Sequence, residues 1–383
     1  MQVAKLNHKK EYNSDSQTII KVPGVTTFLG EFSFYCQGKV ACCANEHELY
    51  VSISENPDNQ VRIYNSLTND RKKFSVSAIK YRKEDKWANY VKGVYYILNE
   101  RGFKLHGVDI YLAGSLLNDA VGVLSSAVST GICLALNSQY KLGLSLDDIT
   151  MVCYKACTSF CGEITRYSTI GTMIKAEKGK FLIYDLSNLT YQMIDNYYKD
   201  SKCSLLTVDC KIPPTAMREE LIYRHSQIKE AFNTLRAKIP YASFKDFPIS
   251  DLTDRIIPLD EETRKYCCAV LEESAAVSSL ARSFNNKDFI QWGKSLGRIG
   301  SNIRDVLELS CPEIDWLIKR SSEIAQCYGA CPISNGDGAC VVIVIENSAI
   351  DKYLAKLEDY ERIFGFKADA LILEPQGCWE QLI

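Results

Sequence analysis

Three turns carry glycines at spacings that could bring backbone N–H groups close to a ligand. They lie at residues 23–38 (PGVTTFLGEFSFYCQG), 118–127 (NDAVGVLSSA) and 329–340 (GACPISNGDGAC). Glycine permits close backbone approach, and the second turn runs directly into an apolar helical pattern, whose first N–H groups attract anions. The chemistry that this indicates is phosphate binding. Taken singly, each turn is equally well explained by turn geometry alone.

The overall composition narrows the class of protein. Apolar residues make up 46% of the 383 residues and charged residues 24%, which is typical of a soluble globular protein with room for two domains. A net charge of −2 provides no field for holding a polyanion, so nucleic acid is not expected as a partner. The sequence has no apolar run of membrane-spanning length and no signal-like start, which predicts a cytoplasmic protein.

Cysteine usage gives little support for a metal or disulfide site. The sixteen cysteines include no C-x-x-C pair, and we expect most of them to be reduced side chains in the core. Cys153, Cys157 and Cys161 recur at four-residue intervals, but a metal site there would need a fourth ligand. The four histidines are isolated in the sequence, which disfavours a histidine-based catalyst.

The elements that must position these turns change in character along the chain. Residues 1–195 predict antiparallel strands at 39–44, 49–54 and 61–64, then a helix over 87–102, a strand over 107–114, a helix after residue 121 and a buried strand at 181–186. Residues 196–383 predict amphipathic helices at 259–284, 288–310 and 311–329, the last capped by Ser310 and Glu313, followed by buried strands at 339–346 and 368–374. The expected fold class is α+β, with two domains and a ligand cleft between them.

Taken together, the three turns resemble the motifs of the galactokinase branch of the GHMP small-molecule kinases. The first keeps six residues of P-G-R-V-N-L-I-G-E-H-T-D-Y-N-x-G without a gap, the second keeps Gly122, Ser125 and Ser126 of P-x-G-x-G-L-S-S-S-A, and the third keeps Gly336 and Gly338 of its glycine-rich motif. Connecting stretches such as WANYVKGV, which contains Trp87, agree as well. The resemblance extends over nearly the whole chain and implies a two-domain GHMP kinase fold.

The same resemblance implies transfer of the γ-phosphoryl group of ATP to the anomeric hydroxyl of galactose. Such a transfer needs a cation, bound Mg²⁺ and usually a carboxylate base. The family's Arg falls on Val25, and the His and Asp that contact the sugar fall on Phe32 and Phe34, so that Glu31 alone remains of that trio. An aromatic face could still stack on a sugar ring. Tyr223 lies where the family has a sugar-contacting Tyr.

Alignment also removes the family's base and metal ligand. The catalytic Asp falls on Thr169 in a gap-free match anchored at Ala156 and Asp185, or on Thr165 if Cys161-Gly162 is used as the anchor. The family's Glu that binds Mg²⁺ falls on Cys157, so the resemblance assigns no firm metal ligand and leaves Ser126 as the one candidate. The resemblance assigns Trp87, Gly122, Ser125 and Ser126 to nucleotide binding and Glu31, Phe32, Phe34, Tyr223, Gly336 and Gly338 to the sugar, with binding of ATP and Mg²⁺ weakened.

Three functions follow as alternatives. We favour a galactokinase-like pseudokinase that keeps the fold and binds a sugar, a nucleotide or a protein partner. The second alternative is an active sugar kinase in which Arg166 supplies the cation and Glu163 the base, although loop residues of these types are usually solvated. The third is a structural protein that binds neither ligand. An assay of ADP release with a panel of hexoses separates the first two.

Overall fold

The computed structural model describes residues 2–66, 68–118, 123–213, 215–241, 243–333 and 340–383. Contacts within the chain group into two units. Unit 1 comprises residues 1–25, 44–178 and 376–383, and unit 2 comprises residues 26–43 and 179–375.

The units do not coincide with the predicted continuous domains 1–195 and 196–383. Residues 26–43 and 179–195 group with unit 2, and residues 376–383 group with unit 1. The reason is that the long strands β1 (Thr18–Leu29) and β2 (Lys39–Glu55) each begin in one unit and end in the other. The C-terminal strand β12 (Glu380–Gln381) returns to pair with β1. Such non-local pairing leaves no mark on local sequence patterns.

Within the described residues, one sheet has eight strands. Its main path runs β12-β1-β2-β5-β3-β4, and β6 pairs with β2 and β7. Most pairs are antiparallel, as predicted, and β3 and β5 are parallel. The remaining strands are β3 (Gln60–Asn65), β4 (Asp70–Ser75), β5 (Val108–Gly114), β6 (Lys180–Asp185) and β7 (Thr190–Asp195). The predicted strands 39–44 and 49–54 are a single strand, β2, because no turn interrupts them.

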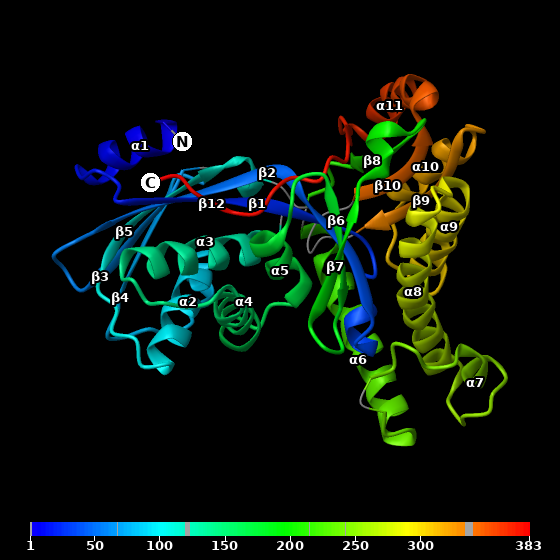
Figure 1. Cartoon of the computed structure of the whole chain (residues 1–383), viewed down its shortest axis with the longest axis horizontal. Helices are drawn as coiled ribbons and strands as arrows, with labels where there is room; N and C mark the ends of the chain where they lie inside the picture. Colours follow the sequence, from blue (N-terminus) through cyan, green and yellow to red (C-terminus); the bar gives the residue numbers. More distant parts are fainter. Residues whose placement is uncertain (1, 67, 119–122, 214, 242, 334–339) are drawn as a thin grey trace. The chain divides into compact units, whose positions relative to one another are not determined.

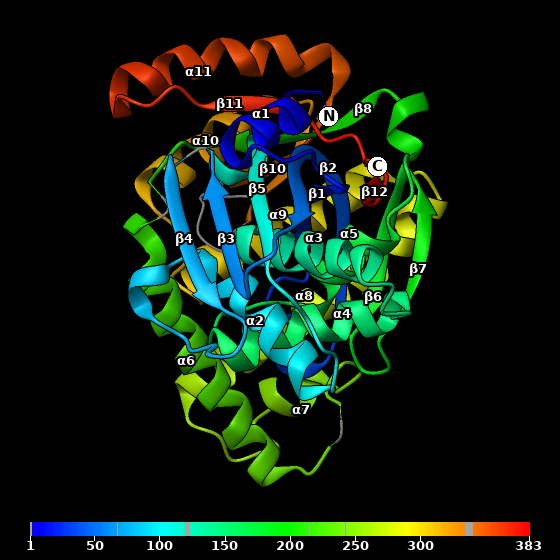
Figure 2. The same ribbon diagram turned by 90° about the vertical axis from the view of Figure 1, so that its left-hand side faces the viewer.

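In unit 1, helices cover both faces of this sheet (Figures 1 and 2). One face carries α2 (Ala88–Glu100), α3 (Leu124–Gln139), α4 (Leu146–Lys155) and α5 (Tyr167–Lys175). Helix α3 lies so close to the strands that a Cβ atom at Gly131 would approach Val51 to 2.5 Å. The predicted helices over 87–102 and after residue 121 are therefore confirmed.

Helix α1 (Gln2–Tyr12) lies on the opposite face and is attached through polar groups. The His8 ring is fully buried, with Nε2 2.9 Å from Ser54 Oγ and Nδ1 3.0 Å from Ser52 Oγ. The Tyr12 hydroxyl donates to the Ile110 carbonyl over 2.6 Å. Burial lowers the pKa of His8 to about 4. His8 is therefore neutral at physiological pH.

Helix α4 begins with a reciprocal capping box. Ser145 Oγ accepts the Asp148 N–H over 3.1 Å, and the Asp148 carboxylate accepts the Ser145 N–H over 3.3 Å. We expect Ser145→Ala to lower the free energy of unfolding by about 1 kcal/mol, the usual value for a lost N-cap. Urea unfolding of the variant measures this loss. Ser145→Asp keeps a capping oxygen and should retain most of the stability, so equal losses in the two variants would contradict the assignment.

Unit 2 contains a four-stranded antiparallel sheet among the described residues, in the order β11-β8-β10-β9. These strands are β8 (Cys203–Asp209), β9 (Cys327–Ile333), β10 (Cys340–Glu346) and β11 (Asp369–Ile372). Helices α10 (Pro312–Ser322) and α11 (Ile350–Phe364) bury one face of this sheet through Leu317, Tyr353 and Tyr360. The predicted buried strand at 339–346 is confirmed as β10.

The other helices of unit 2 are α6 (Thr215–Lys238), α7 (Ile249–Thr253), α8 (Glu261–Asn285) and α9 (Phe289–Asp305). Helices α8, α9 and α10 confirm the three amphipathic helices predicted from residue 259 onward, except that α10 ends at Ser322 and Cys327 begins β9. Helix α9 contacts β9 backbone to backbone, because a Cβ atom at Gly329 would lie 1.8 Å from the Gly293 carbonyl oxygen. Only glycine at both positions allows this approach.

Two local predictions in unit 2 are wrong. Ser310 does not cap α10, because the helix begins after Cys311 and the Ser310 hydroxyl donates to the Asp315 carboxylate instead. The strand predicted as buried at 368–374 is the edge strand β11, in which Leu371 and Ile372 are each 47% exposed. An apolar run does not show whether a strand has one neighbour or two.

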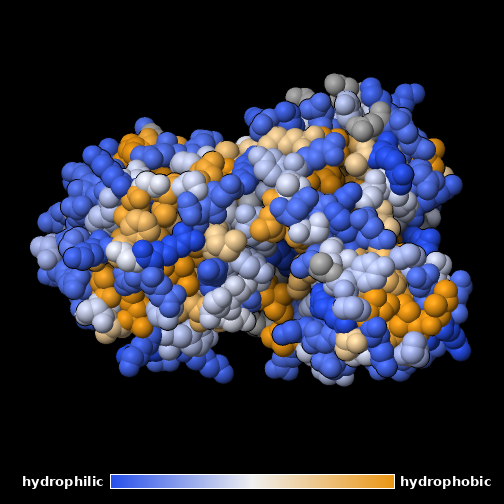
Figure 3. Space-filling model, turned by 60° about the horizontal axis from the view of Figure 1, so that its bottom comes forward, coloured by the Kyte–Doolittle hydropathy of each residue, from blue (hydrophilic) through white to orange (hydrophobic). Residues whose placement is uncertain are grey.

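In the described part of the chain, no helix is both long enough and apolar enough to cross a lipid bilayer. On the face drawn in Figure 3, apolar residues form separate patches among hydrophilic ones.

Candidate ligand site

From residue 26 onward the first glycine-bearing turn lies in unit 2, where a buried carboxylate holds its backbone. Strand β1 ends at Leu29, Gly30 follows with a φ angle of +90°, and a short 3-10 helix spans Ser33–Cys36. The backbone N–H groups of Gly30, Glu31 and Phe32 all donate to Glu273 of α8. Their distances to the carboxylate oxygens are 3.0, 2.9 and 3.0 Å. One side chain thus fixes three consecutive peptide groups.

Glu273 lies in an environment that disfavours its charged form. Its side chain is 3% exposed, and burial raises the pKa of Glu273 to about 7, while the three N–H donors act in the opposite direction. The charge of Glu31, which is itself 4% exposed, raises the pKa of Glu273 further. Glu31 and Glu273 therefore form a buried acidic pair behind the turn.

The two phenylalanines of this turn belong to an aromatic cluster. Phe32 is 1% exposed, and its ring centroid lies 5.4 Å from that of His225 on α6. Phe34 lies 5.9 Å from the same His225 ring and 4.0 Å from Tyr35, while the Tyr35 hydroxyl is 2.7 Å from His225 Nδ1. The Phe32 ring serves packing and offers no open face for stacking on a sugar.

Tyr223 lies on the same helix as His225 but has a different environment. Its side chain is 52% exposed, and the Arg224 guanidinium lies 5.3 Å from its ring centroid. Arg224 also forms ion pairs with Glu220 and Glu308. Tyr223, which was predicted to contact the sugar, therefore has an accessible ring beside a cation that is already paired. Gly336 and Gly338, the other predicted sugar contacts, lie outside the described residues.

The second turn leads into α3 in unit 1. Gly122 lies outside the described residues, and Val123 has a φ angle of 55°, which is costly for a β-branched residue. Ser125 and Ser126 lie in the first turn of α3, where N–H groups lack helical partners. Ser126 Oγ is buried and has no hydrogen-bond partner among the described residues. This helix start has the donors that an anionic ligand requires.

Cys157 approaches the same helix from a π-helical turn at Ala156–Phe160. Its thiol lies 3.2 Å from Ser129 Oγ and donates to the Ser125 carbonyl over 3.5 Å. The side chain is fully buried, and burial raises the pKa of Cys157 to about 11. The thiol is therefore neutral, which makes it a poor ligand for Mg²⁺.

The aligned base and cation positions are buried and uncharged. Thr165 is 8% exposed just before α5, and Thr169 is 2% exposed within α5. Val25 is fully buried in β1. Arg166, which stands between the two threonines at the N-cap of α5, is 6% exposed and thus buried rather than solvated. Trp87, at the N-cap of α2, is 8% exposed.

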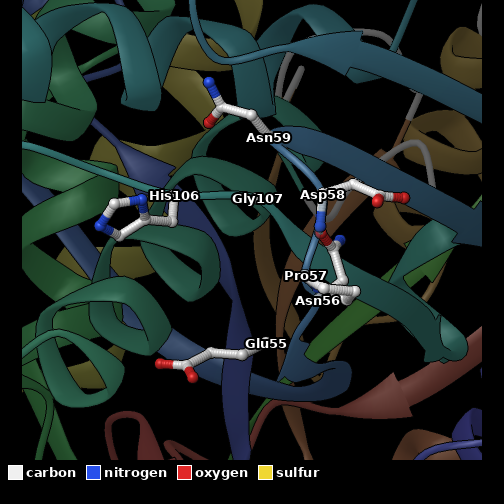
Figure 4. Close-up of a pocket in the computed structure, with 7 residues that line it drawn as sticks. All are labelled: Glu55, Asn56, Pro57, Asp58, Asn59, His106 and Gly107. Atoms are coloured by element: carbon white, nitrogen blue, oxygen red, sulfur yellow. The ribbon is translucent and has the colours of Figure 1, made fainter.

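A separate polar hollow in unit 1 has a volume of about 300 Å³. Its lining residues are Glu55, Asn56, Pro57, Asp58, Asn59, His106 and Gly107. Figure 4 shows the Asp58 carboxylate pointing away from the Glu55 carboxylate and the His106 ring, which both extend to the left of the view. Asp58 pairs with Arg62, and the Asn56 amide donates to Asp109. The lining groups do not converge on a shared point, so this hollow is not a candidate site.

The first turn lies within a region of the chain that matches a known family signature. Residues 6–55 match the galactokinase galactose-binding signature. A galactokinase of Clostridium acetobutylicum is 27% identical over 384 residues, covering 95% of each chain. The crystal structure of Lactococcus lactis galactokinase complexed with galactose superposes with a TM-score of 0.89 at 16% identity, covering 100% of this chain and 99% of that one. Together these matches support a galactokinase-like member of the GHMP kinase family.

The fold of this galactokinase-like chain is also similar to that of a second solved kinase. Methanococcus jannaschii mevalonate kinase, at 15% identity, superposes with a TM-score of 0.62 over 94% of the chain and 98% of its own length. The comparisons support the predicted family, and the predicted two-domain fold, in which helices and sheets are both present, is confirmed. The individual roles assigned to the site residues stay predictions.

Two residues that contact the first turn from α8 and α6 were not predicted from the sequence. Glu273 holds the turn backbone, and His225 joins Phe32, Phe34 and Tyr35. A signal for Glu273 does exist, since it lies three residues after Val270 and four before Val277, both fully buried. A carboxylate on the buried stripe of an amphipathic helix must find donors, and this identifies Glu273 as a residue with partners. His225 gives no comparable signal.

Proposed function

We propose that this galactokinase-like protein is a pseudokinase, which binds a nucleotide or a sugar without transferring phosphate at a kinase rate. The observation that carries the proposal is the neutral, buried Cys157 thiol at the position aligned with the family's Mg²⁺ ligand. Val25 at the aligned cation position and Thr165 or Thr169 at the aligned base position support it. Phosphoryl transfer depends on stabilising the negative charge of its transition state, and none of these three positions carries a charged side chain.

The groups that are present fit a phosphate better than a metal ion. The start of α3 presents backbone donors and the unpartnered Ser126 hydroxyl, which suits the phosphates of ATP. Mg²⁺ requires hard oxygen ligands, and a thiol bonded to Ser129 and to the Ser125 carbonyl does not supply them. When bound, ATP supplies the phosphoryl group, and this chain supplies contacts for binding it.

Two features support retained binding rather than a purely structural role. The Glu273 carboxylate fixes the turn within the galactose-binding signature through three N–H groups. Val123 keeps an unfavourable left-handed conformation directly before α3. Backbone strain of this kind costs about 1–3 kcal/mol and persists mainly where function requires it.

Turnover is the decisive test. We expect purified protein incubated with ATP, Mg²⁺ and galactose or other hexoses to release ADP at least a thousandfold more slowly than the 1–100 per second of ordinary kinases. ATP alone should raise the melting temperature, because a ligand that binds the folded state stabilises it. Ser126→Ala should reduce this shift, whereas Ser138→Ala, near the other end of α3, should not. An absence of any shift with ATP and with sugars would favour a structural protein.

A second candidate function is an active kinase with a rewired site. The burial of Arg166 favours it, since a buried guanidinium beside Thr165 is not the solvated loop residue expected from the sequence. Glu163, which accepts a hydrogen bond from the Tyr90 hydroxyl, is the accompanying carboxylate. If any hexose gives turnover at ordinary kinase rates, Arg166→Met should abolish it. That result would replace the pseudokinase proposal.

A further inference from the structure

Unit 2 contains a second pocket that uses none of the residues assigned above to ATP or sugar. Its volume is about 220 Å³, and its lining residues are Lys39, Ile183, Asp185, Thr190, Tyr191, Gln192, Ser278 and Ala281. They come from β2, β6, β7 and α8. The inference drawn from this pocket does not depend on the proposed function.

Strand register explains why these side chains converge. Lys39 on β2 pairs with Asp185 on β6, and Asp185 pairs with Thr190 on β7. Two residues before Asp185 on β6, Ile183 pairs with Gln192 on β7. Residues directly opposite each other, and residues two apart along a strand, share one face of a sheet. Lys39, Asp185, Thr190 and Gln192 therefore rise from a single face, and Ser278 of α8 completes the pocket wall.

The charges in this pocket do not balance. Asp185 accepts hydrogen bonds from Lys245 Nζ over 2.7 Å and from the Ser187 hydroxyl. Its carboxylate therefore already has partners other than Lys39. These donors lower the pKa of Asp185 against the opposing effect of burial, so that the group is charged and already neutralised by Lys245. Among the described residues, the half-buried Lys39 ammonium forms no ion pair or hydrogen bond, even though Asp185 is its cross-strand neighbour.

The other polar groups of the pocket add donors. Gln192 is exposed and Ser278 is half-buried at the pocket wall, so the amide and the hydroxyl are both accessible to a ligand. An ammonium, an amide and a hydroxyl together form a surface rich in donors with one positive charge in excess. Charge-assisted hydrogen bonds to an oxyanion would satisfy all three groups.

We propose that this pocket binds a small organic oxyanion, namely the carboxylate or phosphate monoester of a short polyol. Lys39 contacts the anionic group, and Gln192 and Ser278 contact its oxygens or neighbouring hydroxyls. The aliphatic Ile183 and Ala281 side chains face the carbon skeleton. A neutral polyol lacks the charge that pairs with Lys39 and binds weakly or not at all.

Three compounds with a common three-carbon skeleton test the charge requirement. We expect glycerol 2-phosphate and D-glycerate, but not glycerol, to bind the full chain in calorimetric titrations, with dissociation constants of roughly millimolar or below. The two oxyanions distinguish a phosphate site from a carboxylate site. Binding should weaken with rising chloride concentration, because the contact is between charges.

Variants assign the binding to Lys39. Lys39→Met keeps the aliphatic stem and should weaken binding of the preferred oxyanion by about tenfold or more, whereas Lys39→Arg should stay within about threefold. Lys73→Met, which removes a strand lysine outside this pocket, serves as the matched control, and Ser278→Ala should weaken binding without touching the sheet. Failure of both oxyanions to bind, equal binding of glycerol, or unchanged binding in Lys39→Met with a native circular dichroism spectrum would overturn the proposal.

Discussion

Glu273→Ala should lower the free energy of unfolding by at least about 3 kcal/mol, because it leaves three buried N–H groups without an acceptor. Each unsatisfied buried donor costs about 1–3 kcal/mol. The donors belong to Gly30, Glu31 and Phe32, and both Glu31 and Phe32 are almost fully buried, so water cannot readily replace the carboxylate. Urea unfolding followed by circular dichroism measures the loss.

The neighbouring glutamate provides the control. Glu272 is partly exposed and contacts Arg298 and Asn302, so Glu272→Ala should cost less than about 1 kcal/mol. Glu273→Gln should fall between the two alanine variants, since its oxygen retains the Gly30 and Glu31 N–H groups while its amide nitrogen faces the Phe32 N–H. Similar losses for Glu272→Ala and Glu273→Ala would show that the carboxylate does not hold the turn.

The hydrogen bonds between Glu273 and the turn show which parts of this structure can be predicted from the sequence and which cannot. Helices α8, α9 and α10 follow from apolar spacing, and β10 follows from an uninterrupted apolar run, because these signals are local. The partner of a buried polar group is not local. Glu273 lies 241 to 243 residues from the turn it holds, and its neighbour Glu272 has the same side chain with a surface role.

Side-chain direction is the second limit on prediction. The residue types of Phe32 and Phe34 left open a stacking contact with a sugar, but the Phe32 ring packs beside His225 and is 1% exposed. Arg166 was expected to be solvated and is buried. For both residues the sequence gives the type of side chain, but its burial is set by neighbours from segments that are distant in the sequence. The strand pairing of β12 with β1 was missed for the same reason.

The two units should respond to pH in opposite directions, through one buried group in each. The folded-state pKa of Glu273 is raised from 4.5 to about 7, so the stability that comes from its bound proton is full below pH 4.5 and is lost as the pH rises toward 7, while its role as acceptor for three N–H groups is separate. The pKa of His8 is lowered from 6.5 to about 4, so its contribution is full above pH 6.5 and is lost as the pH falls toward 4. Each shift corresponds to at most about 3 kcal/mol.

Hydrogen exchange read out by mass spectrometry separates the two effects, because it reports on peptides. Between pH 4.5 and 6.5, after correction for intrinsic exchange rates, peptides covering α1 should gain protection as the pH rises, and peptides covering residues 28–36 should lose it. His8→Asn should flatten the first response alone and Glu273→Gln the second, while His106→Gln, at an exposed histidine, should change neither. If both regions instead changed in the same direction in the wild type, the titration would belong to global unfolding, and burial of these two groups would not be its cause.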